Sequence, residues 1–148
     1  MQSDSGYTTS VWMNTDVPEL PLLSRDIRTG VCVVGAGIAG MTTAYLLGRS
    51  GRAVVVIDDG PIGGGETGRT TAHITAALDD YYTRIEKRHG VEGSRIAAES
   101  HNAAINRIES IASLEDIDCD FERIDGYLFL GEGDDKSVLE QELAAAQR

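Results

Sequence analysis

Three closely spaced glycines between two apolar runs constrain the fold of this chain more than any other feature. The stretch VCVVGAGIAGMTTAYLLGRSGRAVVVIDD, residues 31–59, opens with a β-favouring run, passes the glycines and ends in a second apolar run. Both runs are nearly continuous rather than alternating, which is typical of strands covered on both faces of a parallel sheet. The pattern therefore predicts an α/β fold containing a βαβ unit. Its predicted elements are a strand at 31–35, a helix at 38–48 and a strand at 53–58.

The spacing of the glycines matches a turn that approaches phosphate groups. In a Gly-x-Gly-x-x-Gly turn the first glycine allows the tight bend after the strand, and the second leaves room for a pyrophosphate. The third lets helix and strand pack closely. Gly35, Gly37 and Gly40 have this spacing, and Ile38 and Ala39 begin the predicted helix, whose unpaired N–H groups favour an anion. We therefore predict a dinucleotide site.

An acidic residue completes this motif at the end of the second apolar run. Asp58 follows Gly35 by 23 positions, where a carboxylate can accept hydrogen bonds from an adenosine ribose. The same charge would repel a 2′-phosphate, so an NADP-type ligand is disfavoured. Asp59 comes one residue later and is kept as a candidate, although its side chain is expected to point elsewhere.

The following segment bears on which dinucleotide binds. A nicotinamide-binding unit should continue soon with a helix and a third parallel strand. Here the next strand-like run begins near Phe121, and a second glycine- and threonine-rich loop follows Asp59 instead. This layout favours a flavin enzyme, whereas an NAD-binding or non-catalytic nucleotide-binding module is the alternative.

The remaining sequence predicts helices and one hairpin. Helical stretches at 79–89 and 93–114 are broken at His89-Gly90, and FERIDGYLFL carries Asp125-Gly126, a type I′ hairpin signal. Ser137 and Glu140 could form a capping box for a last helix. We predict four parts: an arm at 1–28, in which Trp12 could anchor onto the globular body; a dinucleotide-binding unit at 29–78; a helical segment at 79–118; and the start of a substrate domain at 119–148.

Composition excludes some partners. The net charge of −11 argues against nucleic acid and anionic membranes, and no apolar run is long enough to span a bilayer. Cys32 and Cys119 lack metal-ligand spacing, so we predict no metal site, and Cys32 is expected to be a buried free thiol. These features, with an N-terminus unlike a signal peptide, fit the cytoplasm.

Residues 29 to about 130 resemble the N-terminal part of FAD-dependent oxidoreductases of the D-amino-acid oxidase type. The likeness is to a bacterial branch with an SVW arm, VCVVGAGIAG, DDGPIGGGETGRTTAH and HGVEGSRIAAESHNAAINRIE. Members often carry a C-terminal Rieske domain, for which this chain has no Cys-x-His motif. The resemblance implies FAD as cofactor and hydride transfer from the C–H beside the nitrogen of an amino acid or secondary amine.

The resemblance also implies a role for the second loop, GGGETGRTTAH at 63–73. There the chain would run along the ribityl-pyrophosphate, with Gly63 to Gly65 allowing close approach and Thr71, Ala72 and His73 nearest the isoalloxazine ring. Non-covalent binding is favoured over attachment through His73. The candidate residues of this loop are Gly65, Thr67, Arg69, Thr70, Thr71, Ala72 and His73.

The resemblance covers the first third of such an enzyme. The last predicted helix has no terminating residue, so we expect residues 1–148 to be the front portion of a longer protein. The expected fold is a Rossmann-like βαβ FAD-binding unit, then helices, then the start of an inserted antiparallel sheet. Alone, this portion is expected to bind FAD poorly, and its catalytic residues and oligomeric state stay unknown.

Overall fold

The computed structural model describes residues 9–148, and the chain divides into two compact units, residues 1–73 and 74–148. Residues 1–8 of the predicted arm lie outside the described part. In the described residues, no helix is both long enough and apolar enough to cross a membrane.

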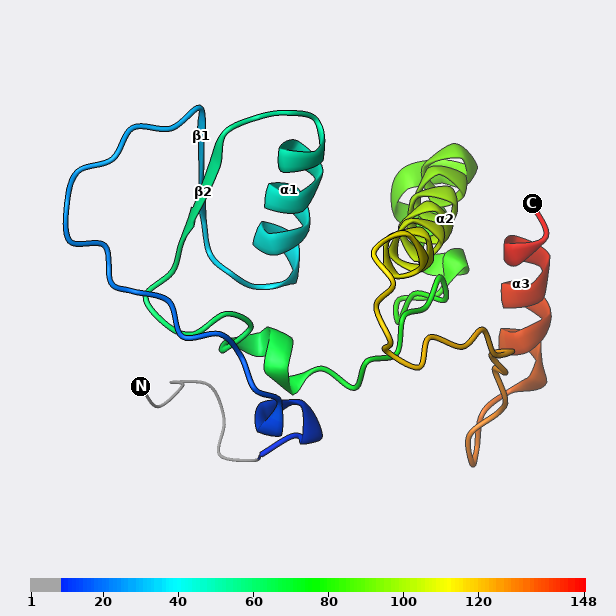
Figure 1. Ribbon diagram of the computed structural model, residues 1–148. Coiled ribbons are helices and arrows are strands. Elements are labelled where there is room, and N and C mark those ends of the chain that lie inside the picture. The colour runs from blue at the N-terminus through cyan, green and yellow to red at the C-terminus, as the bar shows by residue number, and fades with distance from the viewer. Residues whose placement is uncertain (1–8) are drawn as a thin grey trace. The chain divides into compact units, whose positions relative to one another are not determined.

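The first unit contains the predicted βαβ arrangement. Strand β1 (Val31–Val34) and strand β2 (Val54–Ile57) pair in parallel, and helix α1 (Ile38–Arg49) connects them. Val31 lies opposite Val54 in this register. Helix α1 packs against both strands, as Figure 1 shows. The predicted parallel pair is therefore confirmed.

The prediction that both faces of the strands are covered is wrong for β1, whereas all four residues of β2 are half-buried. Along β1, Val31 and Val33 are half-buried, whereas Cys32 and Val34 are exposed. Cys32 is a free thiol, as predicted, but it is not buried. One helix covers only one face of a two-stranded sheet, so the side chains that alternate to the other face meet solvent.

Two short 3₁₀ turns accompany the sheet in this unit. The first, η1 (Val11–Asn14), belongs to the predicted arm, and the second, η2 (Glu66–Arg69), belongs to the second glycine-rich loop. The two turns contact each other. Between residues 15 and 30 the chain has no helix or strand, so the arm adds no element to the βαβ unit.

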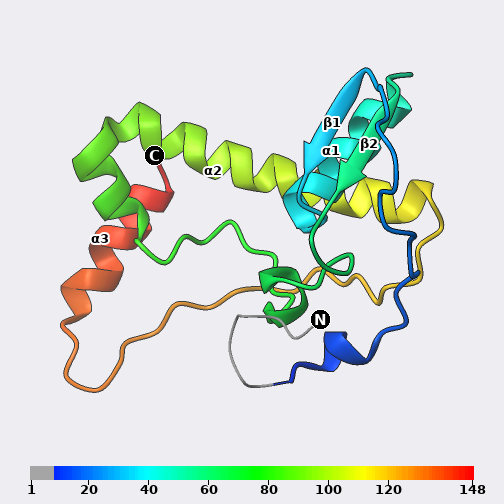
Figure 2. The same ribbon diagram turned by 90° about the vertical axis from the view of Figure 1, so that its left-hand side faces the viewer.

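The second unit consists of two helices and an irregular connection. Helix α2 (Tyr82–Leu114) changes direction at Gly90, whose φ of 74° and ψ of 170° are not helical (Figure 2). The predicted break at His89-Gly90 is confirmed, although α2 begins at Tyr82 rather than at Asp79. Glycine reaches a positive φ without the steric cost that a Cβ imposes, which is why the bend falls there.

Helix α3 (Lys136–Ala146) supplies the N-terminal cap of α2. The Glu142 carboxylate accepts hydrogen bonds from the backbone N–H groups of Tyr82 (2.6 Å) and Thr83 (3.0 Å). The N-cap residue itself, Tyr81, makes no such bond through its side chain. Glu142 is buried, so these two charge-assisted bonds fix α3 against the start of α2.

The capping box predicted at Ser137 and Glu140 is wrong. Helix α3 begins at Lys136, and its N-cap is Asp135. The Asp135 side chain accepts a hydrogen bond from the Ser137 N–H (2.8 Å). An aspartate caps a helix at least as well as a serine, so the earlier residue takes the position.

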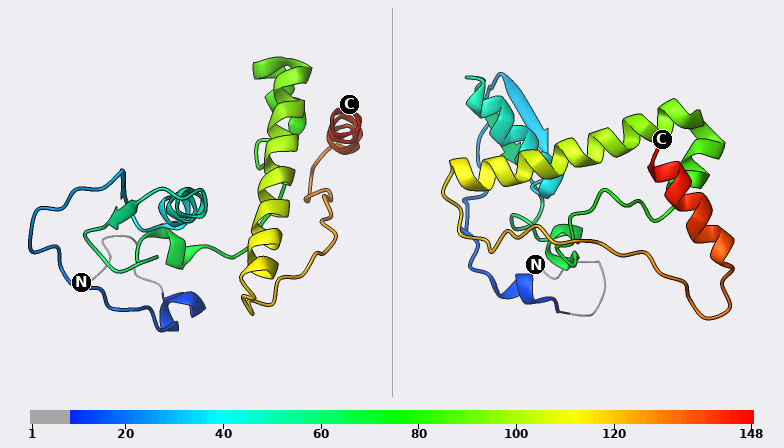
Figure 3. Two further views of the ribbon diagram at one scale, coloured as in Figure 1. Left: turned by 45° about the horizontal axis from the view of Figure 1, so that its top comes forward. Right: turned by 90° about the vertical axis from the view of Figure 1, so that its right-hand side faces the viewer.

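The predicted hairpin, and with it the start of an antiparallel sheet, is also wrong for the described residues. Residues 116–135 form an irregular connection between α2 and α3 with no strand (Figure 3). Neither Asp125 nor Gly126 has the positive φ that a type I′ turn requires. Two strands alone are at best marginally stable, and no third strand lies beside this segment in the second unit.

Candidate cofactor-binding site

The first glycine-rich loop leaves β1 in a tight turn that is tied to β2. Gly35 has a φ of +103°, and its N–H donates to the carbonyl of Ile57 (2.8 Å). A Cβ on Gly40 would lie 1.9 Å from the carbonyl oxygen of Gly35, so only glycine fits there. Gly35 and Gly40 therefore have to be glycines for the steric reasons that the motif predicts.

The second loop lies across the N-terminus of α1. The N–H of Ile38, the first residue of this helix, donates to the hydroxyl of Thr67 (3.1 Å). A Cβ on Gly37 would lie 3.1 Å from the same hydroxyl oxygen. A side chain at Gly37 would therefore press against the second loop where that loop meets the start of α1.

A backbone bond joins the two loops as well. The N–H of Gly63 donates to the carbonyl of Ala36 (2.9 Å), and Gly63 has a φ of +67°. Ala36 is one of the most buried residues of the chain, at 4 % exposure. The two loops that the sequence separates therefore form one site around the start of α1.

Asp58 holds the first loop through both carboxylate oxygens. One oxygen accepts the N–H of Ala36 (2.6 Å) and the other accepts the N–H of Gly60 (2.8 Å). The bond from Ala36, followed by that from Gly60, holds the pKa of the Asp58 carboxyl below its ordinary value of 3.8. The carboxylate is exposed and each oxygen has a further lone pair, so it remains able to accept a ligand hydroxyl. Asp59 is exposed at the next position.

The last residues of the second loop, 70–73, make hydrogen bonds with one another. The hydroxyl of Thr70 accepts the N–H of Ala72 (2.8 Å), and His73 Nδ1 lies 3.1 Å from the hydroxyl of Thr71. Ala72 has a φ of 59°, which is uncommon for a residue with a Cβ. Residues 70–73 are exposed, and Arg69 just before them is half-buried.

Sequence reasoning missed the residues that fasten this loop from outside. Ser10 Oγ donates to the carbonyl of Gly68, and Trp12 Nε1 donates to the carbonyl of Thr70 (2.9 Å). Trp12, the large apolar residue of the arm, was predicted as a possible anchor, but nothing in the sequence identified Ser10 or the target of Trp12, 58 residues away.

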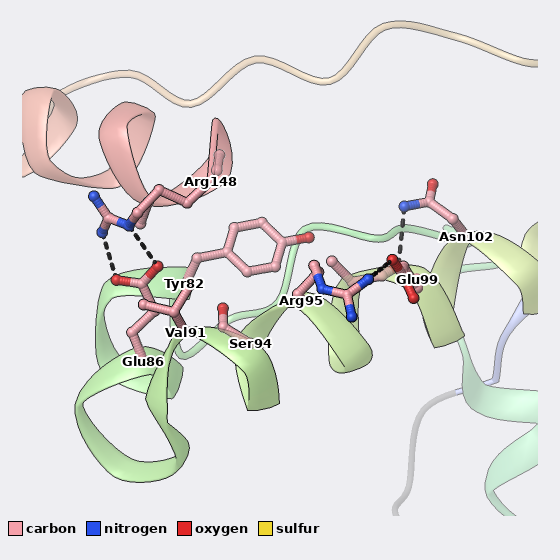
Figure 4. Close-up of a pocket in the computed structure, with 11 residues that line it drawn as sticks. Tyr82, Glu86, Val91, Ser94, Arg95, Glu99, Asn102 and Arg148 are labelled. Atoms are coloured by element: carbon pink, nitrogen blue, oxygen red, sulfur yellow. Dashed lines mark hydrogen bonds and ion pairs between the residues drawn. The ribbon is translucent and has the colours of Figure 1, made fainter.

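A separate cavity of about 220 Å³ lies within the second unit, between α2 and α3 (Figure 4). It is lined in part by Tyr82, Ser94 and Glu86, and the Arg148 guanidinium pairs with Glu86 (2.5 Å) at one end. Burial, followed by the charge of Glu142, raises the pKa of the Tyr82 phenol. None of the predicted cofactor-binding residues lines this cavity.

Comparison with known families agrees with the geometry of the first unit. The family model described as FAD dependent oxidoreductase matches residues 30–148. The chain belongs to this family. The family uses FAD, so the dinucleotide expected at the two joined loops is FAD.

Individual relatives point the same way. The chain is 36 % identical over 78 % of its length to a Bacillus subtilis protein named as a Rieske 2Fe-2S iron-sulfur protein, YhfW. It is 30 % identical over 67 % of its length to gamma-glutamylputrescine oxidoreductase of Escherichia coli, and 25 % identical over 84 % to OrdL of Haemophilus influenzae, named as an oxidoreductase. The matches cover 23 %, 23 % and 29 % of these relatives, so the chain spans about a quarter of their length. No solved structure matches the chain significantly.

Proposed function

We propose that the first unit binds FAD for an oxidoreductase that oxidises the C–N bond of an amino acid or a secondary amine. The observation that carries the proposal is the joining of the two loops across the N-terminus of α1, through Ile38 with Thr67 and Ala36 with Gly63. Family membership supports FAD, and the relative named gamma-glutamylputrescine oxidoreductase supports an amine substrate.

The turn at Gly37 is proposed to meet the pyrophosphate, with no side chain in the way. The first N–H groups of a helix have no partner within it, and the helix dipole favours negative charge at this end. While the Thr67 oxygen accepts the Ile38 N–H, its own O–H can donate to a phosphate oxygen. Gly37, Ile38, Ala39 and Thr67 would therefore hold the phosphates.

Asp58 is proposed to bind the adenosine ribose. Its carboxylate is ionised at neutral pH, as for any aspartate whose pKa is at or below the ordinary value, so it can accept ribose hydroxyls. A negative charge at this position also disfavours a 2′-phosphate. Asp59 is proposed only as a neighbouring charge.

The segment Thr70–His73 is proposed to lie along the flavin, with Gly65 and Arg69 beside the ribityl-pyrophosphate. Bound FAD would supply the hydride acceptor, and these residues would orient it. We propose that binding is non-covalent, so acid precipitation should release all the flavin. We also propose a cytoplasmic setting, because both cysteines are free.

The direct test is the visible spectrum and bound nucleotide of the protein purified at its full natural length. We expect oxidised-flavin absorption that is lost in Gly37→Val, because the valine side chain would press on Thr67 and occupy the place proposed for the pyrophosphate. Gly48→Val is the matched control, because a Cβ on that α1 residue meets nothing within 4 Å. A colourless wild-type protein that releases NAD would favour the alternative, an NAD-binding module.

A further inference from the structure

We infer that residues 10–13 of the N-terminal arm position the second glycine-rich loop for FAD, so that retention of the cofactor depends on the arm. This inference rests on the proposed function. It assigns a positioning role to Ser10 and Trp12, neither of which lies in the dinucleotide motif.

The arm and the loop are joined by side-chain donors and backbone acceptors. Ser10 Oγ donates to the carbonyl of Gly68, and Trp12 Nε1 donates to the carbonyl of Thr70. A Cβ placed on Gly68 would lie 3.8 Å from Met13 Cγ, so the arm also packs on the loop at this point. Ser10, Trp12 and Met13 therefore contact the loop between Gly68 and Thr70.

The fastened stretch lies between the two parts of the loop proposed to meet the cofactor. Thr67, just before Gly68, holds the N–H of Ile38 at the start of α1. Thr70, whose carbonyl receives the Trp12 bond, holds the N–H of Ala72 through its hydroxyl. Loss of the arm bonds should therefore release Thr67 and residues 70–73 together.

The contacts indicate a positioning role rather than a contribution to the core. Trp12 is 47 % exposed, so it lies at the surface rather than in a core. The described residues of the arm supply no strand to the βαβ unit, because η1 is a single 3₁₀ turn and residues 15–30 are irregular. Its hydrogen bonds end on the loop that is proposed to line the flavin.

The test uses the protein at its full natural length, so that any residues beyond these 148 are included. The variants are Trp12→Phe, which keeps an aromatic ring and removes the N–H, and Ser10→Ala. Ser50→Ala is the matched control, because it also removes a hydroxyl that donates to a backbone carbonyl, that of Leu47 in α1. Thermal unfolding of each variant verifies that it is folded.

Two measurements separate the outcomes. In the FAD-free protein, hydrogen exchange at residues 66–73 should accelerate in Trp12→Phe and Ser10→Ala but not in Ser50→Ala. In the FAD-loaded protein, the two arm variants should release FAD roughly 2- to 10-fold faster, the range for one lost hydrogen bond each.

Equal FAD release from the wild type, the arm variants and Ser50→Ala would overturn the inference and leave the proposed function intact. Faster exchange without faster release would also overturn it, because the arm would then hold the loop but not the cofactor. Failure of the wild-type protein to bind FAD would overturn both the proposed function and the dependence on FAD claimed here.

Discussion

The backbone N–H of Ile38 donates to the hydroxyl of Thr67 at 3.1 Å, across 29 residues of sequence. The bond satisfies a donor at the start of α1 that has no partner within the helix. It also places a hydroxyl from the second loop at the end of the helix where phosphate is expected. Together with the backbone bond from Gly63 to Ala36, this contact ties the second loop to the dinucleotide motif.

Thr67→Val should weaken FAD binding while leaving the fold intact. Valine keeps the shape of threonine but neither accepts the Ile38 N–H nor donates to a phosphate, so we expect a loss of roughly 2- to 10-fold in affinity per hydrogen bond. Flavin fluorescence titration measures the effect. Thr43→Val, which removes a hydroxyl bonded only to the Ala39 carbonyl within α1, is the control. Equal affinities in the two variants would contradict the role of Thr67.

Asp58→Ala should lower FAD affinity by at least about tenfold, because a charged acceptor is lost. The same change leaves the N–H groups of Ala36 and Gly60 without their carboxylate partner, so the first loop should also loosen. Asp59→Ala should change affinity little. Isothermal titration calorimetry ranks the two variants. A larger loss of FAD affinity in Asp59→Ala than in Asp58→Ala would mean that Asp59, and not Asp58, binds the ribose.

The stabilising effect of Asp58 should depend on pH. Folding lowers the pKa of this carboxyl below 3.8, so its contribution is fully present above that value and is lost as the pH falls through the folded pKa. Comparison of wild type with Asp58→Asn should show a stability difference that is constant well above pH 3.8 and shrinks as the pH falls below that value. Denaturant titrations measure it. A difference that grows on acidification would mean that the hydrogen bonds favour the protonated carboxyl.

Glu142→Ala should destabilise the second unit. It removes the cap from the N–H groups of Tyr82 and Thr83, a change that costs about 0.5–2 kcal/mol for helix caps. Glu142→Gln retains one acceptor oxygen and should cost less. Glu140→Ala is the control, because Glu140 pairs with Lys136 on the surface of α3. If thermal unfolding ranks Glu140→Ala as the more damaging variant, Glu142 does not cap α2 in solution.

Local chemistry explains which features the sequence could predict. The tight turn at Gly35 and the close packing at Gly40 depend on a few neighbouring residues, and the bend at Gly90 follows from one residue that lacks a Cβ. These positions were predicted correctly because their constraints are steric and short-ranged. The cofactor roles assigned to the loop residues stay predictions.

Features that depend on distant partners could not be predicted in this way. A hairpin at Asp125-Gly126 needs a sheet to join, and burial of Cys32 needs a layer over the second face of β1. The target of Trp12 lies 58 residues away, and its identity depends on how the arm folds back. The capping error at Ser137 has a different cause, because Asp135 is an equally good cap two residues earlier.

The bond between Gly63 and Ala36 joins the two loops through main-chain atoms alone. Substitutions at exposed loop positions can therefore accumulate in descendants of this chain without breaking this hydrogen bond, provided that position 63 remains a glycine. Changes at Thr67 and Asp58 act differently, because these side chains bond to the loop backbone as well as facing the proposed ligand. The main-chain bond is therefore the part of the site that can be inherited while the ligand contacts change.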